Sequence, residues 1–433
     1  MDRLPTVRGV VPFVKGGCPP VLLPGKGQSV FALGAACNRA VLGDTETFSS
    51  QRVPGPEGSF QRLTAGLFSM NGARHTQQRR LVQPAFHKRR VDGYRGTMVA
   101  HAARVLDGWK AGETRDVVPA LQELTLAIAS DALFGIHDTG DLGPRILEIV
   151  SRAISPAARL PLQVWGTPRY TLAQKAASVE ADLRALIAGK RESGLDEPDV
   201  LATLIRARDE GGESLTEDEL IGQMFLLFFA GHDTTRNALA WTLFLLSQHR
   251  DIADALTDEL RGELHGDAPT VEQLARLPLL DRVVKESLRL FPPAPFTSRL
   301  TTQPVTVEGY DLPTGSEVTV SFYHTHRDPD VFPDPAVFLP SRWETATPSV
   351  WEYVPFGAGA RQCIGAGFAT LELRVVLGML LQRFKPGLAR PQLGRETRIV
   401  MSPHPGLPMV MHPADTRPAV VRAEGAVREM VRL

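Results

Sequence analysis

The amino-acid sequence predicts a mainly α-helical fold with small β-sheets. Segments with helical periodicity fill the first two thirds of its 433 residues. The texture changes after Pro292, and strand-like segments gather in the last third. No internal repeat and no low-complexity tract interrupts this order. This distribution indicates a mostly helical protein in which the β parts are small.

The composition limits the classes of protein to which the chain can belong. Hydrophobic residues make up 43% of the sequence, which is enough for a large core. The formal net charge is zero and the pI is about 7.2, which argues against bulk binding to nucleic acid or to an anionic membrane. Three cysteines, Cys18, Cys37 and Cys363, do not form a disulfide framework, so a reducing cytoplasm fits best.

Two segments bear on membrane association. Residues 1–20 contain no apolar run, so we expect neither a signal peptide nor a membrane anchor. The longest apolar segment, residues 221–246, is long enough to span a bilayer. However, His232, Asp233 and Arg236 lie at its middle, where charge is costly in a membrane. The sequence therefore predicts a helix that is buried inside the protein.

Most of the predicted helices lie in the first two thirds of the chain. A short strand at residues 30–33 precedes them, and Pro84 bends or ends the helix that contains it. Thr216 and Glu219 form a capping-box pattern at the start of the long apolar helix. Prolines break the region 141–190 into two or three helices, at Pro156, Pro161 and Pro168. Helical periodicity predicts the other helices at residues 38–42, 71–86, 91–109, 117–134, 199–208, 251–264 and 279–290.

The predicted strands are short and lie near the C-terminal end. Residues 305–307 and 317–322 read as paired strands, with a turn at Gly309 between them. A last long helix comes directly after a glycine-rich loop, and residues 386–413 are irregular or strand.

The glycine-rich loop at residues 356–365 contains Cys363 and leads into the last long helix. Backbone N–H groups and the positive end of the helix favour the thiolate there, so the cysteine is a nucleophile or a metal ligand. A zinc site is excluded, because no second cysteine lies nearby. A papain-like nucleophile needs a histidine base and a different local signature. A dinucleotide-binding loop is also excluded, because Gln362 and Thr370 occupy the places of its third glycine.

The spacing in this loop, Phe-x-x-Gly-x-Arg-x-Cys-x-Gly, resembles the cysteine-ligand loop of the cytochrome P450 family. Its five fixed positions are filled by Phe356, Gly359, Arg361, Cys363 and Gly365. The resemblance implies that Cys363 is the axial thiolate of haem b. Such a ligand donates electron density to the iron and favours O–O cleavage. The glycines let backbone N–H groups approach the sulfur.

A second motif is Glu286-Ser-Leu-Arg289, which places two opposite charges on one helical face. Alone it is weak, because most such pairs are solvated surface contacts. In the P450 family this pair is buried and is completed by an arginine from a proline-rich loop. Residues 338–343 resemble that loop, so the resemblance assigns Arg342 as the partner. We interpret the three residues as structural, because a buried pair needs complete partners.

A third motif, Ala-Gly-His-Asp-Thr-Thr at residues 230–235, interrupts the long apolar helix. It resembles the oxygen-activation motif of the family. The alignment implies that Thr234 hydrogen-bonds the oxygen on the iron and that Asp233 relays protons, both through water. Thr235 is expected to be a supporting residue.

Basic residues spread along the chain match the family's ligands for the haem propionates. His75 and Arg79 share a helical face at i,i+4, and Arg299 and Arg361 fit the same role. An exposed basic helix is the alternative for the first pair. Residues 87–90, His-Lys-Arg-Arg, are either a solvated face or a docking patch for an acidic electron-transfer protein.

The pair His324 and His326 invites a metal interpretation. It precedes a segment that forms a surface turn in the family, so we predict no metal site there.

The resemblance implies one P450 domain over residues 1–433, with a large helical lobe and a small β-rich lobe around a buried haem. It implies insertion of one atom of O2 into an organic substrate. No flavin or iron–sulfur module is seen, so electrons are expected from a separate ferredoxin or flavodoxin with its NAD(P)H-dependent reductase. The protein is expected to be a cytoplasmic monomer without membrane or nucleic-acid partners. Oxidative coupling or rearrangement, and a non-catalytic haem sensor, are the competing functions.

The substrate pocket is assigned by analogy with the family. A long loop at residues 49–71 carries apolar side chains and is of the kind that is often functional. The pocket is expected to be wide and apolar and to take a mid-sized hydrophobic substrate, such as a terpenoid, polyketide, fatty acid or modified peptide from bacterial secondary metabolism. Its predicted lining residues are Phe68, Met70, Leu226, Phe229, Ala230, Ala294, Phe296, Thr297 and Met401.

Overall fold

The structure is a computed structural model of the chain. It describes residues 21–23, 29–136, 141–155, 164–193, 199–397 and 399–433. Two of the predicted helix breaks, Pro156 and Pro161, lie outside the described residues. So do residues 1–20, for which no signal peptide is expected.

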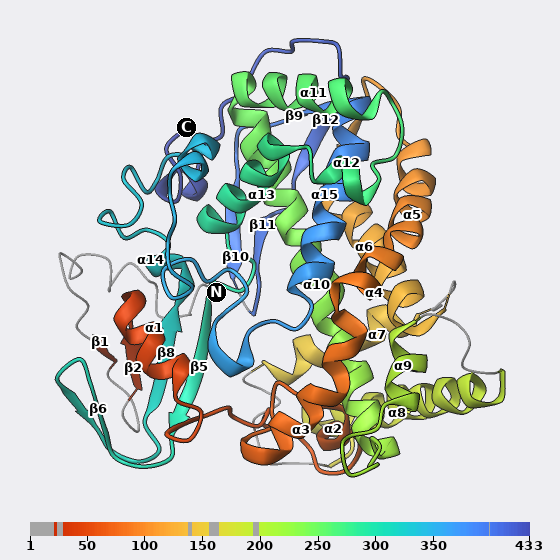
Figure 1. The fold of residues 1–433 in the computed structure, drawn as a ribbon, viewed down its shortest axis with the longest axis vertical. Helices are drawn as coiled ribbons and strands as arrows, with labels where there is room; N and C mark the ends of the chain where they lie inside the picture. The colour runs from red at the N-terminus through yellow and green to blue at the C-terminus, as the bar shows by residue number, and fades with distance from the viewer. Residues whose placement is uncertain (1–20, 24–28, 137–140, 156–163, 194–198, 398) are drawn as a thin grey trace.

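Helices make up most of the molecule and occupy one side of it in Figure 1. The first of them are α1 (Gly34–Gly43), α2 (Ser59–Leu63), α3 (Gly72–Val82), α4 (Lys88–Gly93), α5 (Arg95–Asp107), α6 (Val117–Phe134), α7 (Leu142–Ala153) and α8 (Pro168–Ser193). The others are α9 (Val200–Arg206), α10 (Glu217–Gln248), α11 (Arg250–Leu264), α12 (Val271–Leu274), α13 (Pro278–Leu290), α14 (Phe322–Thr325) and α15 (Ala366–Arg383). Short 3-10 turns include η3 (Gln83–Phe86), η5 (Pro340–Glu344), η6 (Gly359–Arg361) and η7 (Ala426–Glu429).

The strands of the described residues form four small sheets, of which the largest lies apart from the helical bulk in Figure 1. This sheet has the order β1-β2-β8-β5-β3, and all its pairs are antiparallel except the parallel pair β2–β8. Its strands are β1 (Val21–Leu23), β2 (Ser29–Ala32), β3 (Phe48–Ser49), β5 (Phe296–Thr301) and β8 (Glu317–Ser321). The other sheets are β4 (Thr114–Asp116), β12 (Pro408–Pro413) and β9 (Phe384–Leu388); β6 (Val305–Val307) and β7 (Tyr310–Leu312); and β10 (Gly394–Thr397) and β11 (Met401–His404). The mainly α fold with small sheets is therefore confirmed.

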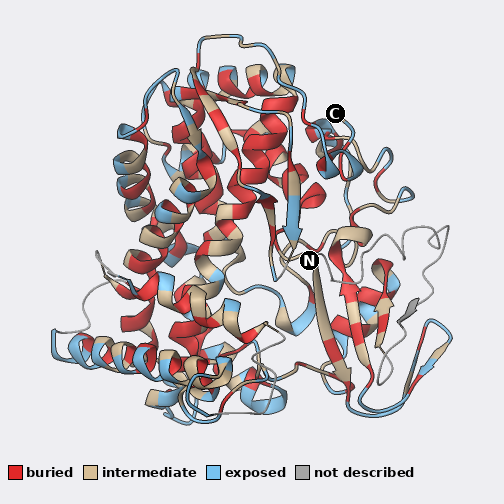
Figure 2. Ribbon diagram, turned by 180° about the vertical axis from the view of Figure 1, so that it is seen from behind, coloured by how far each residue is buried: buried red, intermediate tan, exposed pale blue. Residues whose placement is uncertain are grey.

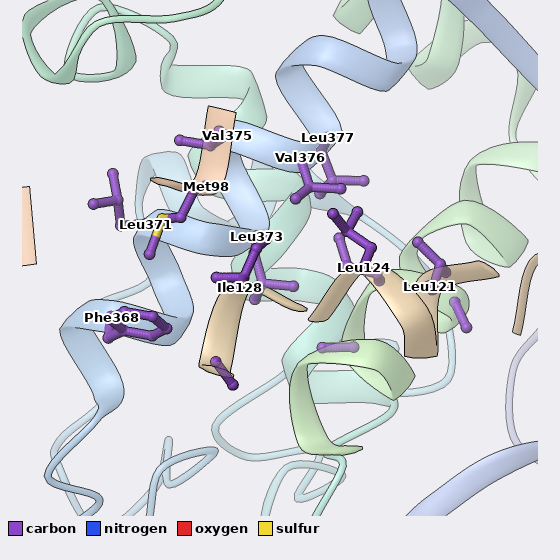
Figure 3. Packing of buried hydrophobic residues seen from close by; sticks show 14 of the residues in the cluster. Met98, Leu121, Leu124, Ile128, Phe368, Leu371, Leu373, Val375, Val376 and Leu377 are labelled. Carbon is purple, nitrogen blue, oxygen red and sulfur yellow. The ribbon is translucent and has the colours of Figure 1, made fainter. Parts of the chain in front are cut away.

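Two hydrophobic clusters form the core of the described residues. The larger one joins the helices, and the smaller one lies between α1 and the largest sheet. Figure 2 shows buried residues concentrated along the central helices. In Figure 3, Met98 of α5 and Leu124 and Ile128 of α6 gather around the side chains of α15. The helix that follows the cysteine loop is thus anchored in the main core.

Helix α10 runs through this core and begins where its capping box predicts. The backbone N–H of Glu219 donates to Thr216 Oγ1 over 3.3 Å, and the N–H of Thr216 donates to Glu219 Oε2 over 2.9 Å. Residues on most of its length are buried, as expected for the long apolar segment. Within the described residues, α6 is the helix long and apolar enough to cross a membrane by length and composition, with 56% of that window buried.

Several elements differ from their predictions. The helix predicted at residues 91–109 is two helices, α4 and α5, which meet at Tyr94. Residues 305–307 pair with β7 and not with residues 317–322. Strand β8 instead lies between β2 and β5, because its alternating buried residues Val318 and Val320 fill the smaller cluster. Strand β5 was missed, since its sequence FTSRLT carries only weak alternation.

The long loop at residues 49–71 contains α2 and passes close to the first turns of α10. A Cβ built on Gly66 would lie 2.6 Å from the carbonyl oxygen of Gly222. A Cβ on Gly222 would lie 3.0 Å from the backbone nitrogen of Gly66. Two glycines therefore allow backbone-to-backbone contact between the loop and the central helix.

We predict that Gly66→Ala lowers the free energy of unfolding by about 1–3 kcal/mol, because the new methyl group meets rigid backbone. Urea unfolding followed by circular dichroism measures this loss. Gly189→Ala is the matched control: a Cβ on this exposed glycine of α8 meets no atom within 4 Å. The control is expected to be neutral or stabilising by up to about 1 kcal/mol. Equal stability of the two variants would contradict the close contact.

Candidate active site

The cysteine loop connects the smaller cluster to α15. Gly357 and Gly359 have φ values of 68° and 70°, which favour glycine. A Cβ on Gly359 would also lie 2.3 Å from the carbonyl oxygen of Leu42 in α1. The backbone N–H of Cys363 donates to the carbonyl oxygen of Phe356 over 2.8 Å and closes the loop. These contacts fix the position of the sulfur three residues before α15.

The environment of Cys363 explains how its thiol can serve as a ligand. The side chain is exposed by accessible area, yet enough protein surrounds the sulfur for burial to raise the pKa of the thiol. A hydrogen bond from the Gly365 backbone and the charge of Arg79 act in the opposite direction on the pKa. The sulfur therefore lies on a recessed but open surface, with a backbone donor and a cation in reach of its charged form.

His75, Arg79, Arg299 and Arg361 come together although they lie on three distant elements: α3, β5 and η6. Burial, followed by the charges of Arg361, Arg79 and Arg299, lowers the pKa of His75 to about 4. Burial and the charge of Arg361 lower the pKa of Arg299 to about 10. Burial and the charge of Arg79 lower the pKa of Arg361. The imidazole is thus neutral at neutral pH, among three guanidinium groups that repel one another.

This cluster lacks negative charge within the described part of the chain. No carboxylate there forms an ion pair with Arg79, Arg299 or Arg361. The Nε–H of Arg361 is buried and has no hydrogen-bond partner. A buried donor without a partner is costly, and like charges together are costly too. The cluster therefore fits a ligand with two carboxylates, as in the propionates of haem.

An accessible stripe runs along α10 although the helix is mostly buried. It consists of Leu226, Phe229, Ala230, Asp233 and Thr234, whose spacing of three and four residues places them on one helical face. None of the five is buried, whereas Leu227, Phe228 and His232 between them are. The hydroxyl of Thr234 donates to the carbonyl oxygen of Ala230 over 2.8 Å. The stripe thus presents apolar and oxygen-bearing side chains together.

Asp233 has a partner that sequence reasoning missed. Arg236 Nη2 lies 2.5 Å from Asp233 Oδ1, and both side chains are largely buried. Arg236 also donates to Gln122 Oε1 on α6 over 2.9 Å. The i,i+3 spacing of Asp233 and Arg236 was the available signal. This ion pair lies at the edge of the stripe.

Glu286, Arg289 and Arg342 form a buried cluster. Glu286 Oε1 accepts from Arg289 Nη2 over 2.8 Å and from Arg342 Nε over 2.9 Å. Glu286 Oε2 accepts from Arg289 Nε and from Trp343 Nε1, each over 2.9 Å. The backbone N–H of Leu339 adds a further donor to Oε1. One carboxylate therefore organises α13 and the proline-rich loop, and Trp343 is a member that the sequence motif did not reveal.

His326 links this cluster to the cysteine loop. Its Nδ1–H donates to the carbonyl oxygen of Arg289 over 3.1 Å, and its Nε2 accepts from the backbone N–H of Val354 over 2.9 Å. His326 itself is fully buried, and the turn expected just after it reaches the surface at Pro329. No group of three or more His, Cys, Asp or Glu side chains among the described residues could hold a metal ion. The histidine transmits the position of α13 to the segment that precedes the cysteine.

Comparison with known proteins decides the family. The family model described as cytochrome P450 matches residues 20–408, most of the chain. The chain belongs to the cytochrome P450 family. It is a haem-thiolate monooxygenase with haem b as its cofactor.

Bacterial and cyanobacterial P450 proteins are among its relatives. The chain is 35% identical to cyclooctatin synthase of Streptomyces melanosporofaciens over 353 residues, covering 76% of each chain. It is 32% identical to cyclooctat-9-en-7-ol 5-monooxygenase of the same organism over 338 residues, covering 75% of this chain and 73% of the relative. Among solved structures, retinoic acid-bound cyanobacterial CYP120A1 matches with a TM-score of 0.80, 29% identity and 89% coverage of each chain.

The predicted pocket residues of this P450 fall into two groups. The α10 residues, together with Ala294, Phe296 and Thr297, keep accessible surface, and Phe68 is 61% exposed. Met70 and Met401 form the second group, because they keep little accessible surface, at 7% and 1% exposure. Met401 belongs to the main core, and its carbonyl oxygen accepts from Trp241 Nε1 over 2.9 Å.

We predict that Glu286→Ala destabilises this P450 by about 3–5 kcal/mol, because two buried guanidinium groups lose their shared counter-charge. Urea unfolding measures the stability, and the haem content per chain reports on the cysteine loop. Should Glu286→Ala fail to fold, Glu286→Gln keeps acceptor and shape and is expected to fold with reduced haem content.

The matched control is Glu344→Ala, which removes the largely exposed partner of Arg282. Its expected cost is below about 1 kcal/mol, as for other surface pairs. Similar losses in the free energy of unfolding for Glu286→Ala and Glu344→Ala would show that the buried cluster stabilises the fold no more than a surface ion pair does.

Proposed function

We propose that this P450 inserts one oxygen atom of O2 into a mid-sized hydrophobic substrate, as a tailoring step of bacterial secondary metabolism. The observation that carries the proposal is the accessible stripe of α10, where Asp233 and Thr234 adjoin Leu226 and Phe229. The two Streptomyces relatives are named for oxidation in the cyclooctatin series, and CYP120A1 is described as bound to retinoic acid. Such apolar ligands fit the side chains of the stripe.

The reaction balances as substrate C–H plus O2, two electrons and two protons, giving C–OH and water. Haem with a cysteine thiolate supplies the oxygen chemistry when bound. In our proposal Cys363 is the thiolate, and His75, Arg79, Arg299 and Arg361 hold the propionates, with Phe356 and Gly365 shaping the loop. These assignments rest on the sulfur's open position and on the uncompensated cluster described above.

The proposed proton path uses two residues of α10. Thr234 carries a proton at Oγ1. In this structure its hydroxyl donates a hydrogen bond to the carbonyl oxygen of Ala230. In this proposal Asp233 separates from Arg236, takes up a proton from solvent water and passes that proton toward the site. Both side chains lie next to the apolar part of the stripe, where bulk water is excluded by the substrate. A non-catalytic haem sensor has no need of such a proton path. An enzyme of oxidative coupling is compatible with the same two residues.

We predict that Thr234→Ala lowers the product formed per electron pair by on the order of tenfold or more, because a proton donor is lost. A substrate is first found by screening apolar compounds for a low-spin to high-spin shift of the haem absorbance. Product and consumed NAD(P)H are then counted together. Thr235→Ala is the control, since this neighbouring hydroxyl is buried and bonds to Gly231. Unchanged yield in Thr234→Ala would remove Thr234 from the mechanism and favour a coupling or sensing role.

We further propose that a separate ferredoxin or flavodoxin, with its NAD(P)H-dependent reductase, docks at residues 87–90. These residues are exposed, and α4, which carries three of them, contacts α15 beside the cysteine loop. Lys88 pairs with Asp92, whereas no carboxylate of the described residues pairs with Arg89 or Arg90. Free positive charge beside the thiolate steers an acidic partner. We also propose that residues 1–433 form a single P450 domain, in line with the family match over residues 20–408. In this proposal the protein is a cytoplasmic monomer.

Replacing both arginines, Arg89→Glu with Arg90→Glu, is expected to slow electron transfer from a reduced ferredoxin by about tenfold or more at low salt. The difference is expected to shrink as ionic strength rises, because salt screens the charges. Stopped-flow reduction under carbon monoxide measures the rate. Arg428→Glu, on exposed η7, is the control. A rate that is unchanged, or a loss independent of salt, would place the docking surface elsewhere.

A further inference from the structure

Residues 64–71, called here the 64–71 segment, connect α2 to α3. Polar and backbone contacts hold the segment at its middle and at its end, and a further contact holds α2 just before it. Arg62 donates through Nε and Nη2 to the two carboxylate oxygens of Glu180, each over 2.8 Å. The hydrogen bonds of Arg62 lower the pKa of the buried Glu180 carboxyl to about 2. This bidentate pair joins α2 to α8.

The middle of the segment rests on α10. Gly66 and Gly222 meet backbone to backbone, as described above. The N–H of Leu67 donates to Gln223 Oε1 over 3.3 Å, and Gln223 Nε2 donates to Gln78 Oε1 on α3 over 3.0 Å. Between these contacts and the end of the segment lies Phe68, a large apolar side chain that is 61% exposed. The segment is therefore held on both sides of an exposed aromatic ring.

The far end is held by an arginine from the cysteine loop. Arg361 Nη2 donates to the carbonyl oxygen of Met70 and, over 2.8 Å, to Asn71 Oδ1. Arg361 Nη1 makes a long contact of 3.5 Å with the carbonyl oxygen of Leu67. Asn71 also exchanges two hydrogen bonds with the backbone of Ser50, of 2.7 and 3.0 Å. Arg361 lies 290 positions after Asn71 in the sequence, so this contact joins two distant parts of the chain.

The guanidinium of Arg361 faces two ways. Its Nη groups are used by the 64–71 segment, whereas its buried Nε–H has no partner and its charge belongs to the cluster around His75. A guanidinium offers five N–H donors in a rigid fork, so one group can serve both sides at once. A carboxylate bound at Nε would fix the plane of the fork and with it the direction of the Nη donors.

We propose that Arg361 is a positioning residue that couples the haem carboxylate site to the 64–71 segment and so controls the passage of large ligands. The inference rests on the proposed function, because it takes this segment to face the substrate. Haem binding orders the segment through Arg361, and the hydrogen bonds from Arg361 to Met70 and Asn71 must break for the segment to open. Large ligands need this release, whereas small ones do not.

The test uses the haem-loaded protein and Asn71→Ala, which removes one acceptor of Arg361. Stopped-flow absorbance follows the binding of 4-phenylimidazole, a bulky haem ligand, and of imidazole and carbon monoxide as small ones. Asn71→Ala is expected to raise the association and dissociation rates of 4-phenylimidazole by roughly three- to tenfold, the effect of one typical hydrogen bond. The rates of the small ligands and the haem content are expected to stay unchanged.

Hydrogen exchange gives a readout that needs no ligand and no activity. In Asn71→Ala, amides at residues 67–71 are expected to exchange faster, while α2, held by Arg62 and Glu180, keeps its protection. Asn71→Asp keeps the oxygen that accepts from Arg361 and from the Ser50 N–H, and removes only the Nδ2 donor to the Ser50 carbonyl oxygen. It is therefore expected to restore wild-type rates.

Three outcomes would overturn the inference. Equal effects of Asn71→Ala and Asn71→Asp would assign the role to the hydrogen bond with the Ser50 carbonyl oxygen and not to Arg361. Rates that change alike for large and small ligands would show a general loss of structure. Unchanged exchange at residues 67–71 would show that Arg361 does not order the segment. None of these results bears on oxygen insertion, so a failure of the proposed function remains distinguishable.

Discussion

One buried carboxylate, that of Glu286, supports the arrangement of the active site. It satisfies two guanidinium groups, an indole N–H and a backbone N–H at once. A buried carboxylate is stable only when all of its hydrogen-bond and charge partners are in place. This requirement fixes the position of α13 relative to the proline-rich loop. His326 extends this constraint to Val354, and the close contact of Gly359 with Leu42 fixes the other side of the cysteine loop. The sulfur is thus held from two directions.

The two charged clusters described above, around Glu286 and around His75, differ in how their charges are compensated. Around Glu286 every charge has its partner, and the pattern gives rigidity. Around His75 the charges are of one sign, and Arg361 keeps an unused buried donor. Uncompensated positive charge of this kind is tolerated at a functional site, where a bound ligand can supply the missing negative charge. On α10 the same division appears on one helix, whose buried side builds the core while its accessible stripe carries the chemistry.

The features that the sequence predicted are those that depend on local spacing. The cysteine loop, the capping box of α10 and the pairing of Glu286 with Arg289 follow from residues a few positions apart. Long-range neighbours were not predictable in this way. The place of β8 between β2 and β5 depends on which faces meet in the smaller cluster. The role of His326 depends on Val354, 28 positions away, and the burial of Met401 depends on Trp241, 160 positions away.

The like-charged cluster has a consequence for the life of the protein in a cell. Without haem, three guanidinium groups repel one another inside the fold, so the cofactor-free chain gives up part of its stability. A ligand that binds only the folded state stabilises it by mass action. We therefore expect the cofactor-free chain to unfold more readily than the haem-loaded one, and so to be the form more open to degradation.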